Sequence, residues 1–553
     1  MKSKRIVALM ATLLMGATTV SAFSGCGPEE IIDSNYDATK AYISVGTYDG
    51  GVGKAWLDDA ARRFEKLNEN TKYGDKTGVT VSVDADKVIY GGANLETSSL
   101  TKDIYFTEGV NYYTFVGKNK AADITDVVTG SMSAYKESGT IEGKLDQGIK
   151  DYMTANTDGK YYMLPFYSGF YGFIYDVDLF EEESLYFNDN GDFIGLEKGS
   201  DDAARATFET DKSNGPDGKE NTYDDGLPAT YDQMIELVEE IASKGLIPFC
   251  YAGSTEYVDK AFRAYISDYE GYDQMRLNYT LSGTANLVTK IEDGKVTTEK
   301  VDITPDNAYE LQKQAGKYYA LKMEEELFGQ LKYIGGAKNE MGHTEAQRKF
   351  LFSKHGGATR YAMLVEGVWW ENEAEATFNE LQVNHQETKL DRRFAFMPIP
   401  KVDANHAGDQ TMISLNSSYC FINKDSQNLE LAKEFMRFLH TDSEMSKFTA
   451  KTSIPRSLNY KVDDADKATA THFGQSLIDM RSQAQVVYPY SSTALVLKNP
   501  SAFDEVKWFA TSTVGKNEYN LPMNIFQEEK ATAESYFNGL YTYQQSQWST
   551  LKK

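Results

Sequence analysis

Short strands and amphipathic helices alternate along the first part of the chain, and this order limits the possible folds more than any other feature. Residues 41–45 have the alternation of a half-buried strand, and apolar side chains recur at helical spacing in residues 56–67. Further strands are expected at residues 79–83 and 103–106. Strands and helices in alternation predict an α/β fold with parallel sheets.

The later parts of the chain keep this pattern in places and depart from it in others. Thr230 and Gln233 have the spacing of a capping box, which predicts that a helix begins there. Residues 188–192 and 199–226 are rich in Gly, Asp and Asn without an apolar period, so we expect loop or hairpin insertions. Beyond Ser457 the pattern is mostly helical.

Length, charge and cysteine content set the class of protein. The chain has 553 residues, and single cores stop growing at about 250 to 300 residues, so we expect two large domains. The formal net charge of -25 argues against nucleic acid or anionic lipid as a partner. Cys250 and Cys420 could form at most one disulfide, and we expect isolated buried thiols.

The N-terminus has the composition of an export signal. Lys2, Lys4 and Arg5 precede an apolar run at residues 6–20. This run is too short for a transmembrane helix, which needs about 20 residues. We therefore expect residues 1–25 to be a signal peptide.

A cysteine closes this signal. The tetrapeptide Phe23-Ser24-Gly25-Cys26 resembles the lipobox of bacterial lipoproteins, in which the cysteine carries a diacylglycerol and starts the mature chain. The family usually has Leu at the place of Phe23, and Val20-Ser21-Ala22 would also suit cleavage without lipidation. The resemblance implies that Cys26 is lipidated and that residues 26–40 tether the protein to the outer face of the membrane.

Several segments of the remaining chain together resemble a known family of transport proteins. They are Gly46-Thr47-Tyr48-Asp49-Gly50-Gly51, Gly159 to Pro165 with Phe170 to Phe180, Gly245 to Phe249, Ala362 to Trp370, Phe394 to Pro400 and Asn423 to Phe435. In this order they are similar to the extracellular solute-binding proteins of ABC importers, which include oligosaccharide-binding proteins. The resemblance implies a periplasmic-binding-protein-like fold, in which two α/β domains joined by a multi-segment hinge close on a ligand cleft.

The resemblance also implies how the chain is divided between the domains. The first domain would combine residues 41–166 and 400–450, and the second would combine residues 167–399 and 455–553. An insertion rich in Asp and Gly, near residues 186–226, belongs to the second domain. The crossings between the domains would fall near Pro165 to Tyr171, near Pro398 and near Pro455.

A sugar site needs flat aromatic platforms beside polar groups that hydrogen-bond the hydroxyls. Trp369 matches the family's Gly-x-Trp segment, whose indole stacks on sugar, whereas Trp370 would point elsewhere, so one of the pair is expected to be structural. The other candidates for ligand contact, with hinge packing or solvent exposure as the alternative, are Tyr48, Asp49, Glu108, Asn111, Tyr167, Tyr171, Glu366 and Arg456.

The acidic insertion offers candidate ligands for a structural calcium ion. Oxygen-rich side chains cluster there, and the candidate ligands are Asp211, Asp217, Asp224 and Asp225. The register of an EF-hand fails, because a count from Asp211 places Pro216 sixth and Thr222 twelfth. A solvated turn rich in Asp and Asn is the alternative.

Motifs of common enzymes are missing from the sequence. It has no Gly-x-Ser-x-Gly, no His-Glu-x-x-His and no phosphate-binding loop. The resemblance implies a monomeric, membrane-tethered receptor that binds a sugar or oligosaccharide outside the cell and delivers it to an ABC permease, with no required cofactor. The 82 acidic residues leave an exported carbohydrate-active enzyme open. A receptor for a non-sugar solute such as a peptide is a further alternative, as is a surface lipoprotein for adhesion.

Overall fold

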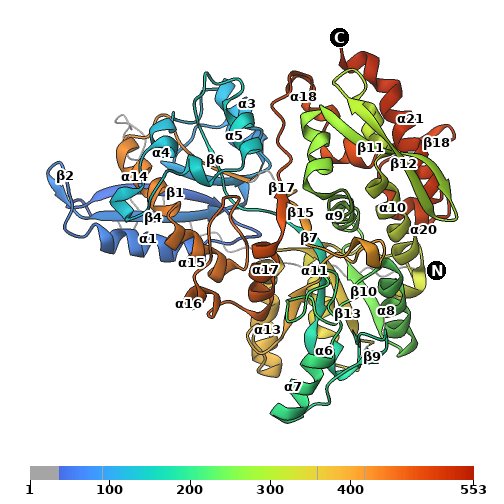
Figure 1. Cartoon of the computed structure of the whole chain (residues 1–553). Helices are drawn as coiled ribbons and strands as arrows, with labels where there is room; N and C mark the ends of the chain where they lie inside the picture. The colour runs from blue at the N-terminus through green and yellow to red at the C-terminus, as the bar shows by residue number, and fades with distance from the viewer. Residues whose placement is uncertain (1–36, 90, 358, 416–417) are drawn as a thin grey trace, which may run out of the picture.

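The computed structural model describes residues 37–89, 91–357, 359–415 and 418–553. Cys26 and the predicted signal peptide lie outside these residues. Within them, no helix is long and apolar enough to cross a membrane. The described chain forms two α/β lobes, each built on its own sheet, with an additional helical region formed largely by the C-terminal part (Figure 1).

The first lobe is built on a five-stranded sheet. Its strands, in spatial order, are β4 (Val79–Asp86), β1 (Ala41–Tyr48), β5 (Ile104–Glu108), β16 (Ser418–Ile422) and β6 (Leu164–Pro165). β1 is parallel to β4 and β5, whereas β16 is antiparallel to β5. The helices of this lobe are α1 (Ala55–Leu67), α2 (Gly92–Thr97), α3 (Tyr112–Gly117), α4 (Thr125–Thr129), α5 (Gln147–Thr154), α14 (Leu429–Leu439) and α15 (Asp442–Thr452). The strands and the first helix thus confirm the expected α/β order.

The second lobe is built on a four-stranded sheet. Its strands, in spatial order, are β10 (Ile247–Tyr251), β13 (Tyr361–Gly367), β7 (Tyr171–Asp176) and β14 (Phe394–Phe396). β10 and β13 are parallel, and β7 is antiparallel to both of its neighbours. The helices around this sheet are α6 (Val177–Glu182), α8 (Tyr231–Ser243), α9 (Tyr257–Thr280), α11 (His343–Phe352), α12 (Trp370–Glu373), α13 (Glu375–His385), α16 (Asp464–Lys467) and α17 (His472–Gln483).

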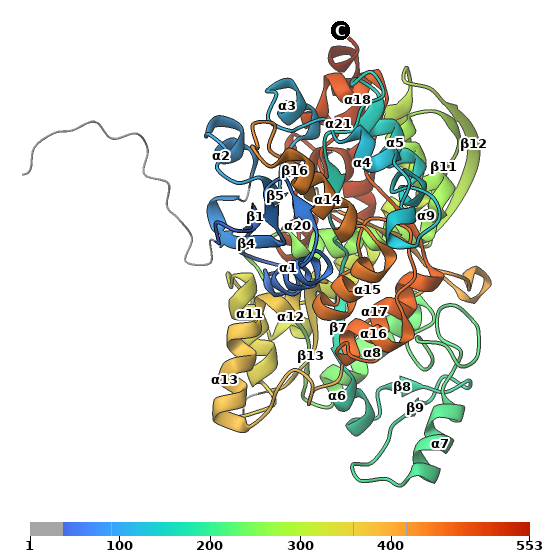
Figure 2. The same cartoon turned by 90° about the vertical axis from the view of Figure 1, so that its left-hand side faces the viewer.

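The C-terminal part packs against α9 and α10 (Ala315–Phe328) beside a long hairpin. The hairpin is formed by β11 (Gly283–Glu292) and β12 (Lys295–Ile303), and both views place it next to the last helix (Figure 2). The helices and strands of this C-terminal part are α18 (Ala494–Lys498), α19 (Glu505–Phe509), β18 (Ser512–Val514), β19 (Asn517–Tyr519), α20 (Pro522–Gln527) and α21 (Ala533–Leu551). The helical character expected beyond Ser457 is confirmed.

Three segments connect the lobes and contact one another. The backbone N–H of Ser168 donates to the Pro455 carbonyl at 2.9 Å, and that of Leu415 donates to the Gly169 carbonyl at 2.8 Å. The second crossing lies between Ile413 and Ser418, because β15 (Thr411–Ile413) still pairs with β17 (Gln485–Val487) outside the first sheet. The predicted crossing near Pro398 was therefore placed too early in the sequence.

The insertion contains a helix that the sequence pattern does not predict. α7 (Asp202–Asp211) is capped by Asp201, whose carboxylate accepts the Ala204 N–H at 2.8 Å. Phe208 is its one buried side chain, so no apolar period exists to reveal it. The hairpin of β8 (Tyr186–Phe187) and β9 (Phe193–Ile194) agrees with the expected insertion.

Cys250 and Cys420 are both buried and free, as expected. Cys250 lies on β10 in the second sheet, whereas Cys420 lies on β16 in the first. Burial raises the pKa of each thiol to about 12. Both cysteines are therefore uncharged packing residues at neutral pH.

Candidate ligand-binding site

A cavity of about 970 Å³ lies between the two lobes. From the first lobe it is lined by Tyr48 and Glu108, the last residues of the parallel strands β1 and β5, and by Asn111. From the second lobe it is lined by Tyr171 and Trp369. The carboxyl ends of parallel strands are where open α/β sheets bind ligands, so this is the expected place for a site.

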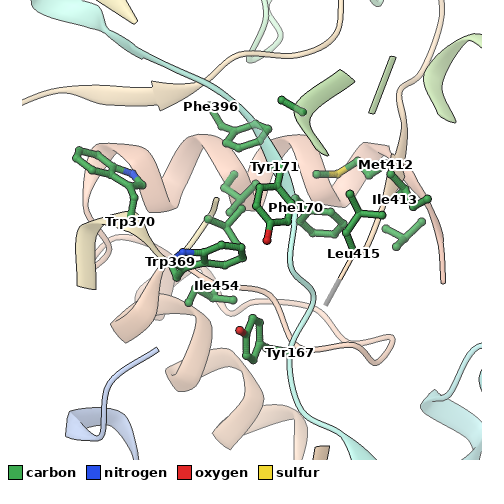
Figure 3. Packing of buried hydrophobic residues seen from close by; sticks show 14 of the residues in the cluster. Tyr167, Phe170, Tyr171, Trp369, Trp370, Phe396, Met412, Ile413, Leu415 and Ile454 are labelled. Atoms are coloured by element: carbon green, nitrogen blue, oxygen red, sulfur yellow. The ribbon is translucent and has the colours of Figure 1, made fainter. Parts of the chain in front are cut away.

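Trp369 and Tyr171 form the aromatic surface of the second lobe. Their ring centroids are 5.0 Å apart at an interplanar angle of 85°, and the two side chains point toward one another (Figure 3). Tyr257 completes the group, with its ring 5.3 Å from Tyr171 and 6.3 Å from Trp369. Such edge-to-face packing holds each ring in a defined orientation.

The Gly-x-Trp spacing has a steric cause. The indole of Trp369 folds back over Gly367, where an added Cβ would lie 2.3 Å from Cζ2 of the indole. No side chain other than hydrogen leaves room for the indole in this position. Gly367 is the last residue of β13. Because it has no side chain, the indole of Trp369 can occupy the position in which it lines the cavity.

Trp370 has the structural role that one member of the pair was expected to have. Its side chain points away from Trp369 and Tyr171 and is fully buried at the start of α12 (Figure 3). The ring of Phe394 lies 5.0 Å from it at 88°, and the rings of Phe378 and Phe473 lie 5.9 and 5.8 Å away. The indole of Trp370 thus belongs to the apolar core.

Two carboxylates from different lobes line the cavity near Trp369. Burial, with a smaller contribution from the charge of Glu373, raises the pKa of Glu108 to about 7, although a hydrogen bond with Tyr167 lowers it. Burial also raises the pKa of Glu373, although nearby His343 and a hydrogen bond with the Trp369 side chain lower it. Surroundings of low dielectric constant favour the protonated, uncharged form of a carboxyl group. Glu108 and Glu373 can therefore lie in one cavity without strong charge repulsion.

The loop after β1 brings the two lobes close together at this place. A Cβ added to Gly51 would lie 3.7 Å from Oε1 of Glu108 and 3.7 Å from Cβ of Trp369. Gly51 has φ +48°, which favours glycine. Gly51 therefore lies next to both the carboxylate of the first lobe and the tryptophan of the second.

The family of the chain can now be stated from a comparison with known proteins. Residues 50–445 match the family model of the bacterial extracellular solute-binding proteins. The chain belongs to this family. A comparison with curated proteins gave no match.

Solved structures of solute-binding proteins have a similar fold. The cyclic alpha-maltosyl-1,6-maltose binding protein of Arthrobacter globiformis matches with a TM-score of 0.51 and 11% sequence identity, over 92% of this chain and 100% of that one. RafE in complex with raffinose matches with a TM-score of 0.50 and 15% identity, over 93% of this chain and 100% of that one. This chain and the two solved structures are similar in their two-domain fold.

Six of the residues singled out from the sequence of this solute-binding protein line the cavity together. They are Tyr48, Glu108, Asn111, Tyr167, Tyr171 and Trp369. Asp49, Glu366, Trp370 and Arg456 are not part of the lining. Asp49, which directly follows β1, is exposed.

Glu366 and Arg456 are buried elsewhere in the solute-binding protein. Gln347 donates to Oε1 of Glu366 at 3.0 Å, and burial raises the pKa of this carboxyl group well above its usual range. The guanidinium of Arg456 lies 5.1 Å from the Phe448 ring centroid and 2.9 Å from Nε2 of His440. The guanidinium of Arg456 has no hydrogen-bond partner for Nε or Nη1 among the described residues. Neither Glu366 nor Arg456 lines the cavity.

Carboxylates of the acidic insertion accept hydrogen bonds from groups within the insertion itself. Asp224 accepts the N–H of Asp217 at 2.9 Å and the hydroxyl of Thr222 at 2.6 Å, while Asp217 accepts the N–H of Lys219 at 2.7 Å. Among the described residues, no group of three or more His, Cys, Asp or Glu side chains is placed to hold a metal ion. The calcium site with Asp211 and Asp225 therefore has no support from geometry.

Sequence reasoning missed several residues of the lining. Tyr257 and Lys260 come from the first turn of α9, and Lys260 Nζ lies 5.3 Å from the Tyr171 ring centroid. Glu373 follows Trp369 by four residues, a proximity that could have identified it. The C-terminal contribution, which includes Tyr490, carries no motif that marks it.

Proposed function

We propose that this protein is an extracellular receptor that binds a sugar or an oligosaccharide in the cavity between its lobes. The observation that carries the proposal is the placement of Trp369 and Tyr171 beside Glu108, Glu373 and Asn111. An indole face suits the C–H face of a sugar ring, and carboxylate and amide groups accept hydrogen bonds from its hydroxyls. Two proteins of similar structure bind raffinose and cyclic alpha-maltosyl-1,6-maltose, which supports an oligosaccharide as the ligand.

Binding would act through closure of the two lobes. A ligand in the cavity contacts Glu108 of the first lobe and Trp369 of the second, so it favours the state in which both are close. The three contacting crossings at Ser168, Leu415 and Pro455 provide the hinge. We infer that this closed form is what an ABC permease recognises.

The location of the receptor follows from its N-terminus. We propose that Cys26 carries a lipid that holds a monomeric receptor at the outer face of the cell membrane. Two acyl chains give stable anchoring, because each buried CH₂ contributes about 0.8 kcal/mol. Delivery then requires diffusion only along the membrane surface.

A thermal-shift screen tests the proposed function. The purified protein is heated with mono- and oligosaccharides, amino acids and peptides, and a ligand that binds only the folded state raises the melting temperature. We expect a selective rise with one class of glycan. A rise with peptides alone would identify a receptor for a different solute.

The alternative of an exported carbohydrate-active enzyme has one favourable observation, since Glu108 and Glu373 are two carboxyl groups in one cavity. Incubation of the protein with the glycan that shifts the melting temperature distinguishes the two functions. A receptor leaves the glycan intact during hours of incubation, as chromatography would show. If shorter sugars are released, and a Glu108 variant releases none, the protein is an enzyme and not a receptor.

A further inference from the structure

The cavity has a third wall that lies beyond the family match. The match ends at residue 445, whereas residues 489–509 line one side of the cavity. We call residues 489–509 the C-terminal wall. The wall therefore adds residues to the site that the family match does not include.

The C-terminal wall is anchored to the second lobe. Ser491 Oγ donates to the Tyr279 carbonyl at 2.5 Å, and Trp508 Nε1 donates to Asn278 Oδ1 at 3.0 Å, so two points of the wall are attached to the end of α9. Glu505 forms an ion pair with Arg263 of the same helix at 3.2 Å. Three contacts therefore attach the wall to α9 of the second lobe.

On the other side, the C-terminal wall meets aromatic rings of the first lobe. The ring of Tyr490 lies 5.0 Å from that of Tyr152 on α5 and 6.4 Å from that of Tyr419 on β16. Tyr113 adds a further ring 5.1 Å from Tyr152. We call these four residues, all of which line the cavity, the tyrosine platform.

The tyrosine platform is separate from the group of Trp369, Tyr171 and Tyr257. Among the described residues, no ring of one group is paired with a ring of the other. Both groups line one cavity of about 970 Å³, which is at the upper end of the range for ligand pockets. The cavity thus offers two aromatic surfaces with room for more than one sugar ring.

We propose that Tyr490 on the C-terminal wall determines the length of the ligand, which is an oligosaccharide with one ring at Trp369 and another at the tyrosine platform. The proposal rests on the proposed function, because it concerns the same cavity. A monosaccharide reaches one of the two aromatic surfaces and leaves the other without a partner. An oligosaccharide of two or more rings gains contacts on both.

Calorimetric titration with sugars of increasing length tests this proposal. The probes are glucose, maltose and maltotriose, then galactose, melibiose and raffinose, then xylose, xylobiose and xylotriose. In the series that binds, we expect the longer sugars to bind at least about tenfold more tightly than the monosaccharide, since one stacking contact of about 1.4 kcal/mol is a factor of ten.

Variants of Tyr490 separate its role from that of the rest of the site. Tyr490→Ala should weaken binding of the longest sugar about tenfold and leave binding of the monosaccharide unchanged, because one of the two surfaces is lost. Tyr490→Phe keeps the ring and should bind both as the wild type does. Tyr519→Ala, on a hairpin outside the cavity lining, is the matched control. If Tyr490→Ala does not fold, Tyr152→Ala removes a ring of the same platform from the other lobe.

Two results would overturn the proposal and leave the proposed function intact. One is a wild type that binds the monosaccharide as tightly as the longer sugars of its series. The other is an equal loss of affinity for short and long sugars in Tyr490→Ala. A protein that binds no sugar, in these series and in the thermal-shift screen, would instead overturn the proposed function.

Discussion

Trp369 and Trp370 are neighbours in the chain and lie in opposite surroundings. Trp369 faces a cavity with Glu108, Glu373 and Lys260 in its lining. Trp370 is enclosed by phenylalanine rings, and its indole N–H has no hydrogen-bond partner among the described residues. The comparison indicates that the proposed binding role of Trp369 depends on the polar groups beside its ring, and not on the ring alone.

The largest expected effect concerns the core side of this comparison. Trp370→Ala removes a fully buried indole and should lower the free energy of unfolding by about 3–5 kcal/mol, since the space cannot be refilled. Urea denaturation followed by circular dichroism measures the change. A loss below about 1 kcal/mol would mean that Trp370 is not a core residue.

The carboxyl group on the cavity side should make stability depend on pH. The pKa of Glu108 is raised to about 7 in the folded protein, above the usual value of 4.5. The unfolded chain therefore loses this proton first, and the contribution of Glu108 to folding becomes unfavourable as the pH rises from about 4.5 to 7, by up to about 3 kcal/mol.

Glu108→Gln tests this dependence, because it removes the titrating group and keeps the shape. The variant should be more stable than the wild type at pH 8, and the difference should shrink toward pH 4.5. Asp176 is the contrasting residue, since Arg392 and Arg360 hold the pKa of its buried carboxyl group below the usual value. The contribution of Asp176 therefore stays constant between pH 4.5 and 8. Urea midpoints of the wild type and of Glu108→Gln across this pH range measure the effect of Glu108. If Glu108→Gln is more stable than the wild type by the same amount at every pH, the pKa of Glu108 is not raised in the folded protein.

A smaller effect is expected from the glycine that places Trp369. Gly367→Ala brings a Cβ into the indole and should cost about 1–3 kcal/mol of stability as the ring is displaced. Affinity for the ligand should fall in parallel. Gly408→Ala is the matched control, because a Cβ at Gly408 meets nothing within 4 Å. Equal behaviour of the two variants in urea denaturation and calorimetry would show that the indole does not depend on Gly367.

Much of the fold could be predicted because its signals are local. β1, α1, β4 and β5 have apolar periods that are read within a few residues, and the structure confirms each of them. α7 was missed because a helix with one buried side chain has no such period. The second crossing was misplaced because β15 pairs with β17, a contact between segments far apart in the chain.

The site could be predicted in part, for a related reason. Residues at strand ends such as Tyr48 and Glu108 follow from the α/β pattern, which places them at one edge of the sheet. Glu366 lies in the same motif as Trp369 but faces the interior, where Gln347 binds it, and only tertiary packing decides this. The hydrogen bond from Ser491 to Tyr279 joins residues 212 apart, so the C-terminal wall has no local signal.

The central claim is that a sugar binds on Trp369 in the cavity between the lobes. Calorimetric titration of the wild type, Trp369→Ala and Trp370→Phe with the sugar that raises the melting temperature tests it most directly. We predict that Trp369→Ala weakens binding at least about tenfold and that Trp370→Phe, which keeps a ring in the core, binds as the wild type does. Unchanged affinity in a folded Trp369→Ala variant would contradict the claim.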